Sequence, residues 1–184
     1  MVTSNTSESG ATGDRRVPHA ILVGLPGAGK STVGRRVAKS LGRDFLDFDN
    51  EIVRREGKTI AAIFSELGES YFRKLEIGLT RSLKASSGMI VAPGGGWICQ
   101  PGMPELLGGT GRTIYLRVTP EAVFHRLRRI SERPLLAAGD PLEKLRELYS
   151  ARRDKYEKAD YVVDAETLSK EELITEVARI AAAF

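Results

Sequence analysis

The sequence predicts an α/β fold with a parallel β-sheet, and three observations support this prediction. Short apolar runs alternate with longer segments of helical pattern along the chain. The first apolar run leads directly into a glycine-rich segment, residues 24–31, and a helix-forming stretch follows it. The segments that carry chemistry come mainly at or just after the ends of the predicted strands, where ligands bind in an open α/β sheet.

Five short segments rich in apolar residues are the predicted strands. In chain order they are residues 19–23, 44–46, 89–92, 113–118 and 161–163. The predicted helices are residues 32–41, 50–56, 60–85 with a break near Gly68, a segment opened by Pro120, 141–156 and 169–183. Proline suits the first turn of a helix, where its missing N–H is not needed.

Two segments do not fit a regular element. Residues 131–140 contain too much Pro, Gly and Ala, and we expect a flap between two helices. Residues 1–17 are rich in Ser, Thr, Gly and Glu, and we expect a disordered tail that is neither a secretory signal nor a membrane anchor. The remainder, residues 18–184, is expected to form one domain.

Composition limits the classes of function. A hydrophobic fraction of 41% in 184 residues is enough for a core without disulfides or a structural metal. The single cysteine, Cys99, is expected to pack rather than react, and this usage favours a reducing cytoplasm. The net charge of +4 does not call for nucleic acid, and nothing indicates a membrane partner. A modest basic excess suits an anionic small molecule together with a triphosphate.

The glycine-rich segment reads Gly-Leu-Pro-Gly-Ala-Gly-Lys-Ser and has the pattern of a P-loop. Its glycines allow backbone N–H groups to turn around a phosphate chain. Lys30 would add a charge at the β- and γ-phosphates, and Ser31 would offer a hydroxyl to Mg²⁺. An ordinary glycine-rich turn is the weaker interpretation, because a strand and a helix flank the motif. We therefore expect ATP to contact Gly27, Ala28, Gly29, Lys30, Ser31 and Thr32.

Asp47 and Asp49 directly follow the second predicted strand. In phosphoryl transfer one carboxylate is needed near Mg²⁺, and another can hold or deprotonate the attacking hydroxyl. An acidic turn that caps the next helix is an equally good interpretation of this pair taken alone.

Four further segments carry polar or glycine signals. Arg73 and Glu76 are three residues apart on a predicted helix, so the carboxylate can hold the guanidinium group. Three glycines at 94–96 follow a strand and allow the backbone to approach a ligand closely. Arg133 lies in the predicted flap, and Arg152 lies one helical turn before Tyr156.

Together and in this order, these segments resemble the shikimate kinase family. The resemblance runs from about residue 20 to residue 164 and rests on the P-loop, Asp-x-Asp, Phe-Arg-x-x-Glu, Gly-Gly-Gly, Arg-Pro-Leu and Arg-x-x-x-Tyr elements. It implies a three-layer α/β/α P-loop kinase fold with a five-stranded parallel sheet in the order 2-3-1-4-5. It also implies transfer of the γ-phosphate of ATP to the 3-hydroxyl of shikimate, with Mg²⁺, in aromatic amino acid biosynthesis. We expect a monomer in the cytoplasm.

The resemblance implies a role for particular side chains. Asp49 would hold the substrate hydroxyls and act as base, and Asp47 would order the water shell of Mg²⁺. Arg73 and Arg152 would clamp the shikimate carboxylate through planar contacts that lysine could not reproduce. The backbone of Gly95 and Gly96 would contact the substrate.

Two more arginines receive roles from the same resemblance. Arg133 would close over the transferring phosphoryl group. Arg126 would lie against adenine, although Arg128 or Arg129 could serve if the helix register differs. The spacing after Tyr156 likewise leaves Arg153 as an alternative to Arg152 for the arginine that faces the substrate.

The chain departs from the family pattern at Trp97, which is bulkier than the residue expected there. Trp97 could line the substrate pocket or pack under the following loop, and packing is the favoured interpretation. Three other functions compete with a shikimate kinase: a related small-molecule kinase such as a gluconate kinase, a nucleotide-binding regulatory module, and a nucleic-acid-associated NTPase. The regulatory module would predict a damaged acceptor-binding set, and the NTPase would predict a basic stripe with stacking aromatics.

Overall fold

A computed structural model of the chain describes residues 16–127 and 140–184. It contains a parallel five-stranded sheet in the order β2-β3-β1-β4-β5, which confirms the predicted topology. The strands are β1 (His19–Val23), β2 (Phe45–Asp47), β3 (Ile90–Ala92), β4 (Gly111–Arg117) and β5 (Tyr161–Asp164).

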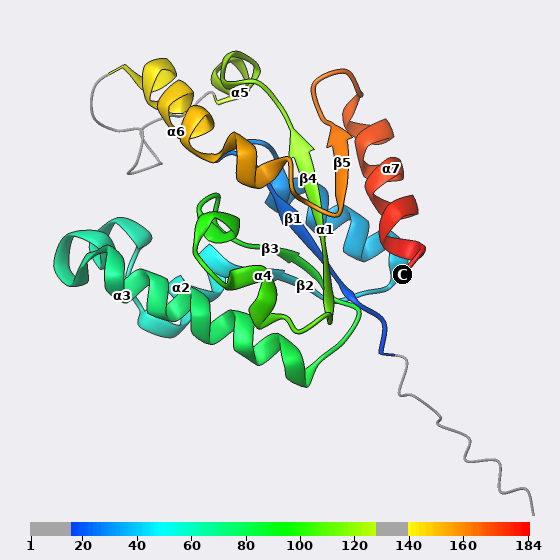
Figure 1. The fold of residues 1–184 in the computed structure, drawn as a ribbon, viewed down its shortest axis with the longest axis horizontal. Helices are drawn as coiled ribbons and strands as arrows, with labels where there is room; N and C mark the ends of the chain where they lie inside the picture. Colours follow the sequence, from blue (N-terminus) through cyan, green and yellow to red (C-terminus); the bar gives the residue numbers. More distant parts are fainter. Residues whose placement is uncertain (1–15, 128–139) are drawn as a thin grey trace, which may run out of the picture.

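Helices cover both faces of the sheet (Figure 1). They are α1 (Lys30–Leu41), α2 (Phe48–Glu56), α3 (Ile60–Ser82), α4 (Met103–Leu106), α5 (Pro120–Arg126), α6 (Pro141–Tyr156) and α7 (Lys170–Ala182), with short 3₁₀ turns η1 (Leu83–Ala85) and η2 (Trp97–Cys99). Helix α1 lies behind the strands and packs against α7, while α4 and α6 lie in front of the strands (Figure 1) and both contact η2. The predicted three-layer α/β/α fold is therefore confirmed.

The central strands are buried on both faces, as expected for a parallel sheet between two layers of helices. All five residues of β1 and all three of β3 are buried. Because β1 lies between β3 and β4, the residues that follow β1 emerge in the middle of the sheet edge. The chain continues to β2 and β3 on one side of β1 and to β4 and β5 on the other, and ligands bind near such a switch point.

Several predicted boundaries move by one to three residues. The second helix begins at Phe48 rather than at residue 50, because the side chain of Asp47 accepts a hydrogen bond from the backbone N–H of Asn50 and caps it. The fourth strand begins at Gly111 rather than at residue 113, since Gly111 pairs with His19. The break predicted near Gly68 is present, with φ of 80° and ψ of 166° at that residue.

The ends of the predicted tail and flap fall partly within the described residues. The carbonyl of Val17 accepts a hydrogen bond from the N–H of Gly88, and Arg16 donates to the carbonyl of Lys84. Asp140 caps α6 by accepting a hydrogen bond from the N–H of Leu142. The rest of the tail, residues 1–15, and the rest of the flap lie outside the described residues.

Candidate active site

The P-loop connects β1 to α1 at the switch point of the sheet. Gly27 and Gly29 have φ of 88° and 97°, a backbone conformation that L side chains rarely adopt. A Cβ at Gly27 would also lie 2.9 Å from Cγ1 of Val123, so the end of α5 packs against this loop. The glycines therefore permit both the turn and its close packing.

Lys30 opens α1, and its ammonium group is held inside the P-loop. Its Nζ donates to the carbonyl oxygens of Gly24 and Leu25 at 2.9 and 3.0 Å. Ser31 and Thr32 follow in the first turn, where helical N–H groups are free to meet an anion. The loop thus has the charge and the donors that the sequence predicted for phosphate binding.

Asp47 and Asp49 lie at the carboxyl end of β2 and in the first turn of α2. Asp47 is half-buried and caps α2, so the capping interpretation of this pair holds for one member. Asp49 points toward the triple glycine: a Cβ at Gly94 would lie 3.6 Å from its Oδ1. That Cβ would also lie 2.9 Å from Oε1 of Glu76, so two carboxylates converge beside Gly94.

Arg73 lies on α3 between two carboxylates. Its Nη1 donates to Oε2 of Glu76 at 2.7 Å, and its Nη2 and Nε donate to Oε1 of Glu69 at 2.6 and 3.1 Å. Burial opposes the charge of Arg73, but the hydrogen bonds to Glu76 and Glu69 outweigh it and raise its pKa. A Cβ at Gly96 would lie 3.2 Å from Nη2, so the guanidinium group lies against the triple-glycine turn.

Glu76 is a fully buried carboxylate in this cluster. Burial raises its pKa, although Arg73 and Gln100 donate hydrogen bonds to it, and the nearby Asp49 acts in the same direction as burial. Gln100 Nε2 donates to Oε2 of Glu76 at 2.6 Å, whereas Oε1 has no hydrogen-bond partner among the described residues.

Sequence reasoning did not identify two members of this cluster, Glu69 and Gln100. Glu69 lies four residues before Arg73, and this helical spacing could have predicted the pair. Gln100 is 24 residues from Glu76, and no local signal predicts their contact.

Trp97 is packed inside the protein, in agreement with the packing interpretation favoured from the sequence, and its hydrogen-bond partner lies on α3. Its side chain is fully buried, and its indole N–H donates to Oγ1 of Thr80 at 2.9 Å. The N–H of Trp97 also donates to the carbonyl of Gly94 and closes the turn. Gly96 is buried, and Gly95 is half-buried with its own carbonyl accepting a hydrogen bond from Tyr156.

Arg152 lies on α6, which contacts η2. It is half-buried, and its Nη1 is buried without a hydrogen-bond partner in residues 16–127 and 140–184. Arg153, the alternative, is exposed and lies over the ring of Tyr149. Burial raises the pKa of the Cys99 thiol, while Arg152, Lys155 and Arg73 act against that shift. Arg152 and Arg73 therefore both lie near Cys99, the last residue of η2.

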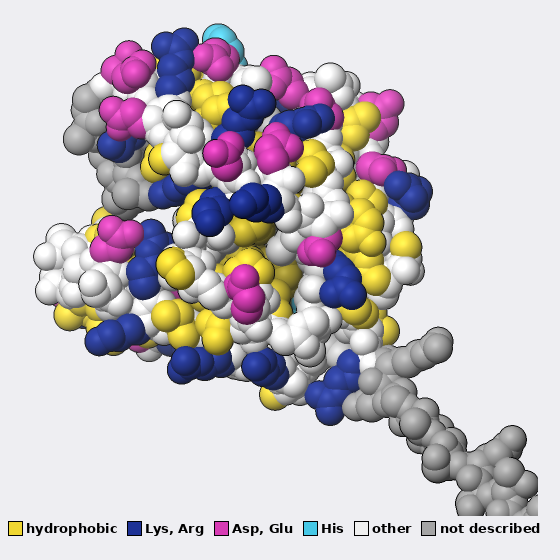
Figure 2. Space-filling view, in the orientation of Figure 1, with side chains coloured by type: hydrophobic (Ala, Val, Ile, Leu, Met, Phe, Trp, Pro, Cys, Tyr) yellow, Lys and Arg dark blue, Asp and Glu magenta, His cyan; other side chains and the backbone are white. Residues whose placement is uncertain are grey.

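Arg126 is exposed at the end of α5, and its Nη2 donates to the carbonyl of Ala165 at 2.7 Å. Arg128, Arg129 and Arg133 lie outside the described residues. Figure 2 shows an open notch between the α2–α3 part of the molecule and α6, with Lys and Arg side chains beside it.

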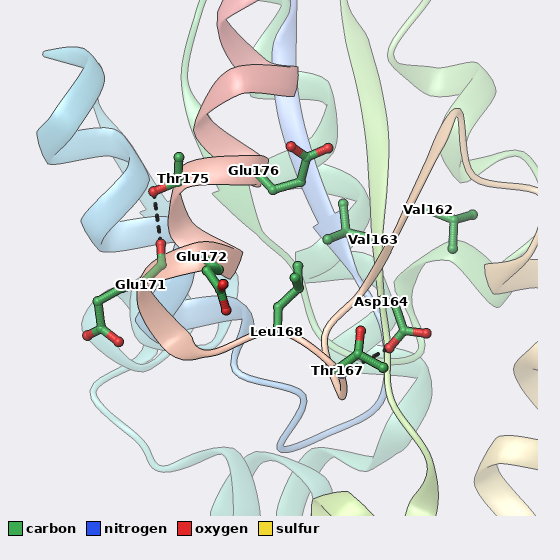
Figure 3. Close-up of a pocket in the computed structure, with 9 residues that line it drawn as sticks. All are labelled: Val162, Val163, Asp164, Thr167, Leu168, Glu171, Glu172, Thr175 and Glu176. Carbon is green, nitrogen blue, oxygen red and sulfur yellow. Dashed lines mark hydrogen bonds between the residues drawn. The ribbon is translucent and has the colours of Figure 1, made fainter.

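A second, shallow groove runs between β5 and α7, at the far edge of the sheet (Figure 3). Three of its acidic side chains serve local structure. Asp164 accepts hydrogen bonds from two N–H groups of the following turn, Glu172 completes the capping box of α7, and Glu176 pairs with Arg179. It contains none of the predicted site residues.

Within the described ranges, none of the helices combines the length and apolar character needed to span a bilayer.

The chain resembles known proteins over most of its length. A family profile described as "Shikimate kinase" matches residues 26–182. A shikimate kinase of Thiobacillus denitrificans is 48% identical over 144 residues, which are 78% of this chain and 79% of the relative. The chain belongs to the shikimate kinase family.

Solved structures agree with membership of the shikimate kinase family. A shikimate kinase from Acinetobacter baumannii, determined in complex with shikimate, superimposes with a TM-score of 0.83 at 37% identity, covering 91% of this chain and 94% of that one. A gluconokinase from Sinorhizobium meliloti superimposes with a TM-score of 0.56 at 20% identity, covering 92% and 94%. The second likeness shows only that the two proteins share a fold.

Proposed function

We propose that this protein transfers the γ-phosphate of ATP to the 3-hydroxyl of shikimate. The observation that carries the proposal is that Arg73 lies against Gly96, Asp49 faces Gly94 of the same turn, and α6 brings Arg152 to the adjoining η2. Nη1 of Arg152 is a buried donor without a partner in the described chain. A substrate carboxylate would satisfy it, because planar guanidinium groups bind carboxylates through paired hydrogen bonds.

Asp49 is the proposed base. Its Oδ1 faces the position of Gly94, on the same turn whose Gly96 lies against Arg73. A ring anchored by its carboxylate between Arg73 and Arg152 would present a hydroxyl toward Asp49 and the P-loop. Holding the acceptor hydroxyl in line with the γ-phosphate removes much of the entropic barrier to transfer.

The P-loop supplies the electrostatic part of the reaction. The loose transition state of phosphoryl transfer places negative charge on the γ-phosphate oxygens. Lys30 is held inside the P-loop, where its charge would stabilise those oxygens. We propose the same role for Arg133, and contact with adenine for Arg126.

Mg²⁺ fits the donors at this edge of the sheet. The described residues contain no group of three His, Cys, Asp or Glu that could hold a metal by themselves. Magnesium is usually bound by one or two carboxylates together with substrate phosphates and water. The hydroxyl of Ser31 and the carboxylate of Asp47, acting through water, are the proposed protein donors. The ion would supply charge neutralisation between the β- and γ-phosphates.

An assay of ADP release with Mg-ATP and alternative acceptors tests the function. We expect turnover with shikimate and little with gluconate, because two fixed arginines suit a rigid cyclic carboxylate. Preference for gluconate would refute the proposal. We also propose that the protein is a monomer in the cytoplasm. A mass of one chain in light scattering would support the monomer. Full activity in reducing buffer would agree with the cytoplasm.

The variant Asp49→Asn tests the base. We expect kcat to fall by at least about a hundredfold, the usual contribution of general base catalysis, with ATP affinity retained. Full activity of Asp49→Asn would show that another group accepts the proton.

A further inference from the structure

Tyr156 makes a hydrogen bond that joins two separate parts of the proposed shikimate site. It is the last residue of α6, one turn after Arg152, and its side chain is fully buried. Its hydroxyl donates to the carbonyl oxygen of Gly95 at 2.6 Å, across 61 residues of sequence. The proposed site otherwise draws on Arg152 from one side of this bond and on Gly95 and Gly96 from the other.

The triple-glycine turn depends on such external contacts for a fixed position. Glycines lose more conformational freedom on folding than other residues, so a run of three is easily displaced. Within the turn, the N–H of Trp97 donates to the carbonyl of Gly94, and the N–H of Cys99 donates to that of Gly96. These bonds shape the turn, but they do not connect it to α6. The hydrogen bond from Tyr156 to the carbonyl of Gly95 connects the turn to α6.

We propose that the Tyr156 hydroxyl is a positioning group for shikimate binding. By fixing the carbonyl of Gly95 to α6, it would set the spacing between the Gly95–Gly96 backbone and the guanidinium group of Arg152. This inference rests on the proposed function and assigns to Tyr156 a role that the motif alone did not give it.

The ring of Tyr156 is held independently of its hydroxyl. It stacks on the ring of Tyr115 with centroids 5.1 Å apart and an interplanar angle of 20°. Burial raises the pKa of Tyr156 to about 12, so the hydroxyl stays protonated and donates throughout the neutral range. Phenylalanine at this position would therefore keep the packing and remove the hydroxyl, which donates to Gly95 and also interacts with the side chain of Arg152.

Tyr115 provides a matched control. Its ring belongs to the same stacked pair, and its hydroxyl is buried but has no hydrogen-bond partner among the described residues. The substitutions Tyr156→Phe and Tyr115→Phe thus remove the same atom from neighbouring buried rings. Only the first removes a bond to the glycine turn.

The experiment compares the two variants with the native protein by steady-state kinetics, and by a direct titration that measures Kd for shikimate. We expect Tyr156→Phe to raise KM and Kd for shikimate about five- to tenfold, the loss of one hydrogen bond, with KM for ATP and kcat within about twofold of native. Tyr115→Phe should leave all of these constants within about twofold.

Other outcomes would overturn the inference. An unchanged shikimate KM in Tyr156→Phe would show that the bond does not position the turn. Equal losses for shikimate and ATP, or a variant that is unfolded in urea-free buffer, would show a general structural role instead. Failure of the native protein to phosphorylate shikimate would refute the proposed function itself. The two failures are distinguishable, because the role of Tyr156 is judged by comparing variants with a native protein that turns over shikimate.

Discussion

Replacing Thr80 by valine should weaken the support of the triple-glycine turn. Thr80 is fully buried on α3, where its Oγ1 accepts from the indole N–H of Trp97 at 2.9 Å and donates to the backbone carbonyl of Glu76 at 2.8 Å. Valine has the same shape and a similar helix propensity, so the main change is the loss of an acceptor for a buried N–H. Such a loss costs about 1–3 kcal/mol of unfolding free energy.

The assay is urea unfolding followed by fluorescence. Trp97 is the only tryptophan in the sequence, so its emission reports directly on this contact. With a slope of about 2–3 kcal/mol/M for a chain of this size, the midpoint should fall by about 0.3–1.5 M in Thr80→Val.

Thr80→Ser is the matched control, because it keeps the hydroxyl and removes a buried methyl group. The methyl group is worth about 1 kcal/mol, and the hydrogen bond to Trp97 should persist. The native emission spectrum of Trp97 should therefore change in Thr80→Val and stay unchanged in Thr80→Ser. A valine variant as stable as the native protein, with unaltered emission, would refute the reasoning.

Three further predictions concern stability and binding. In Gly34→Ala the new Cβ would lie 2.6 Å from Cε2 of Phe45, so the free energy of unfolding, measured by chemical denaturation, should fall by about 1–3 kcal/mol. The control Gly78→Ala has open space around the new Cβ and should not lower the free energy of unfolding. Arg73→Ala should weaken shikimate binding by about 2–4 kcal/mol in a calorimetric titration, and unchanged affinity would exclude its contact with the carboxylate. Burial lowers the pKa of His19 below 6.5 in the folded protein. As the pH falls, the unfolded chain therefore binds a proton at His19 at a higher pH than the folded protein does, which favours unfolding. Stability should therefore decrease from about pH 7.5 to 5.5, and His19→Gln should show a flatter dependence in the same unfolding assay.

The elements with strong local signals were predictable from the sequence. The apolar run before the P-loop, the glycine break at Gly68 and the proline at the start of α5 each have a local physical cause. Boundaries that depend on partners were not: β4 begins at Gly111 because it pairs with His19 across the sheet. The short elements η2 and α4 were also missed, since a turn of three or four residues has no periodicity to detect.

The sequence by itself determined the P-loop, the order of strands and helices and the residue types available for chemistry, because these follow from spacing along the chain. Tertiary structure decided which side chains meet. Arg152 rather than Arg153 is turned inward by the register of α6, and Gln100 reaches Glu76 only because η2 folds back over α3. Such contacts join segments far apart in the chain, and their geometry depends on how whole elements pack rather than on any local pattern.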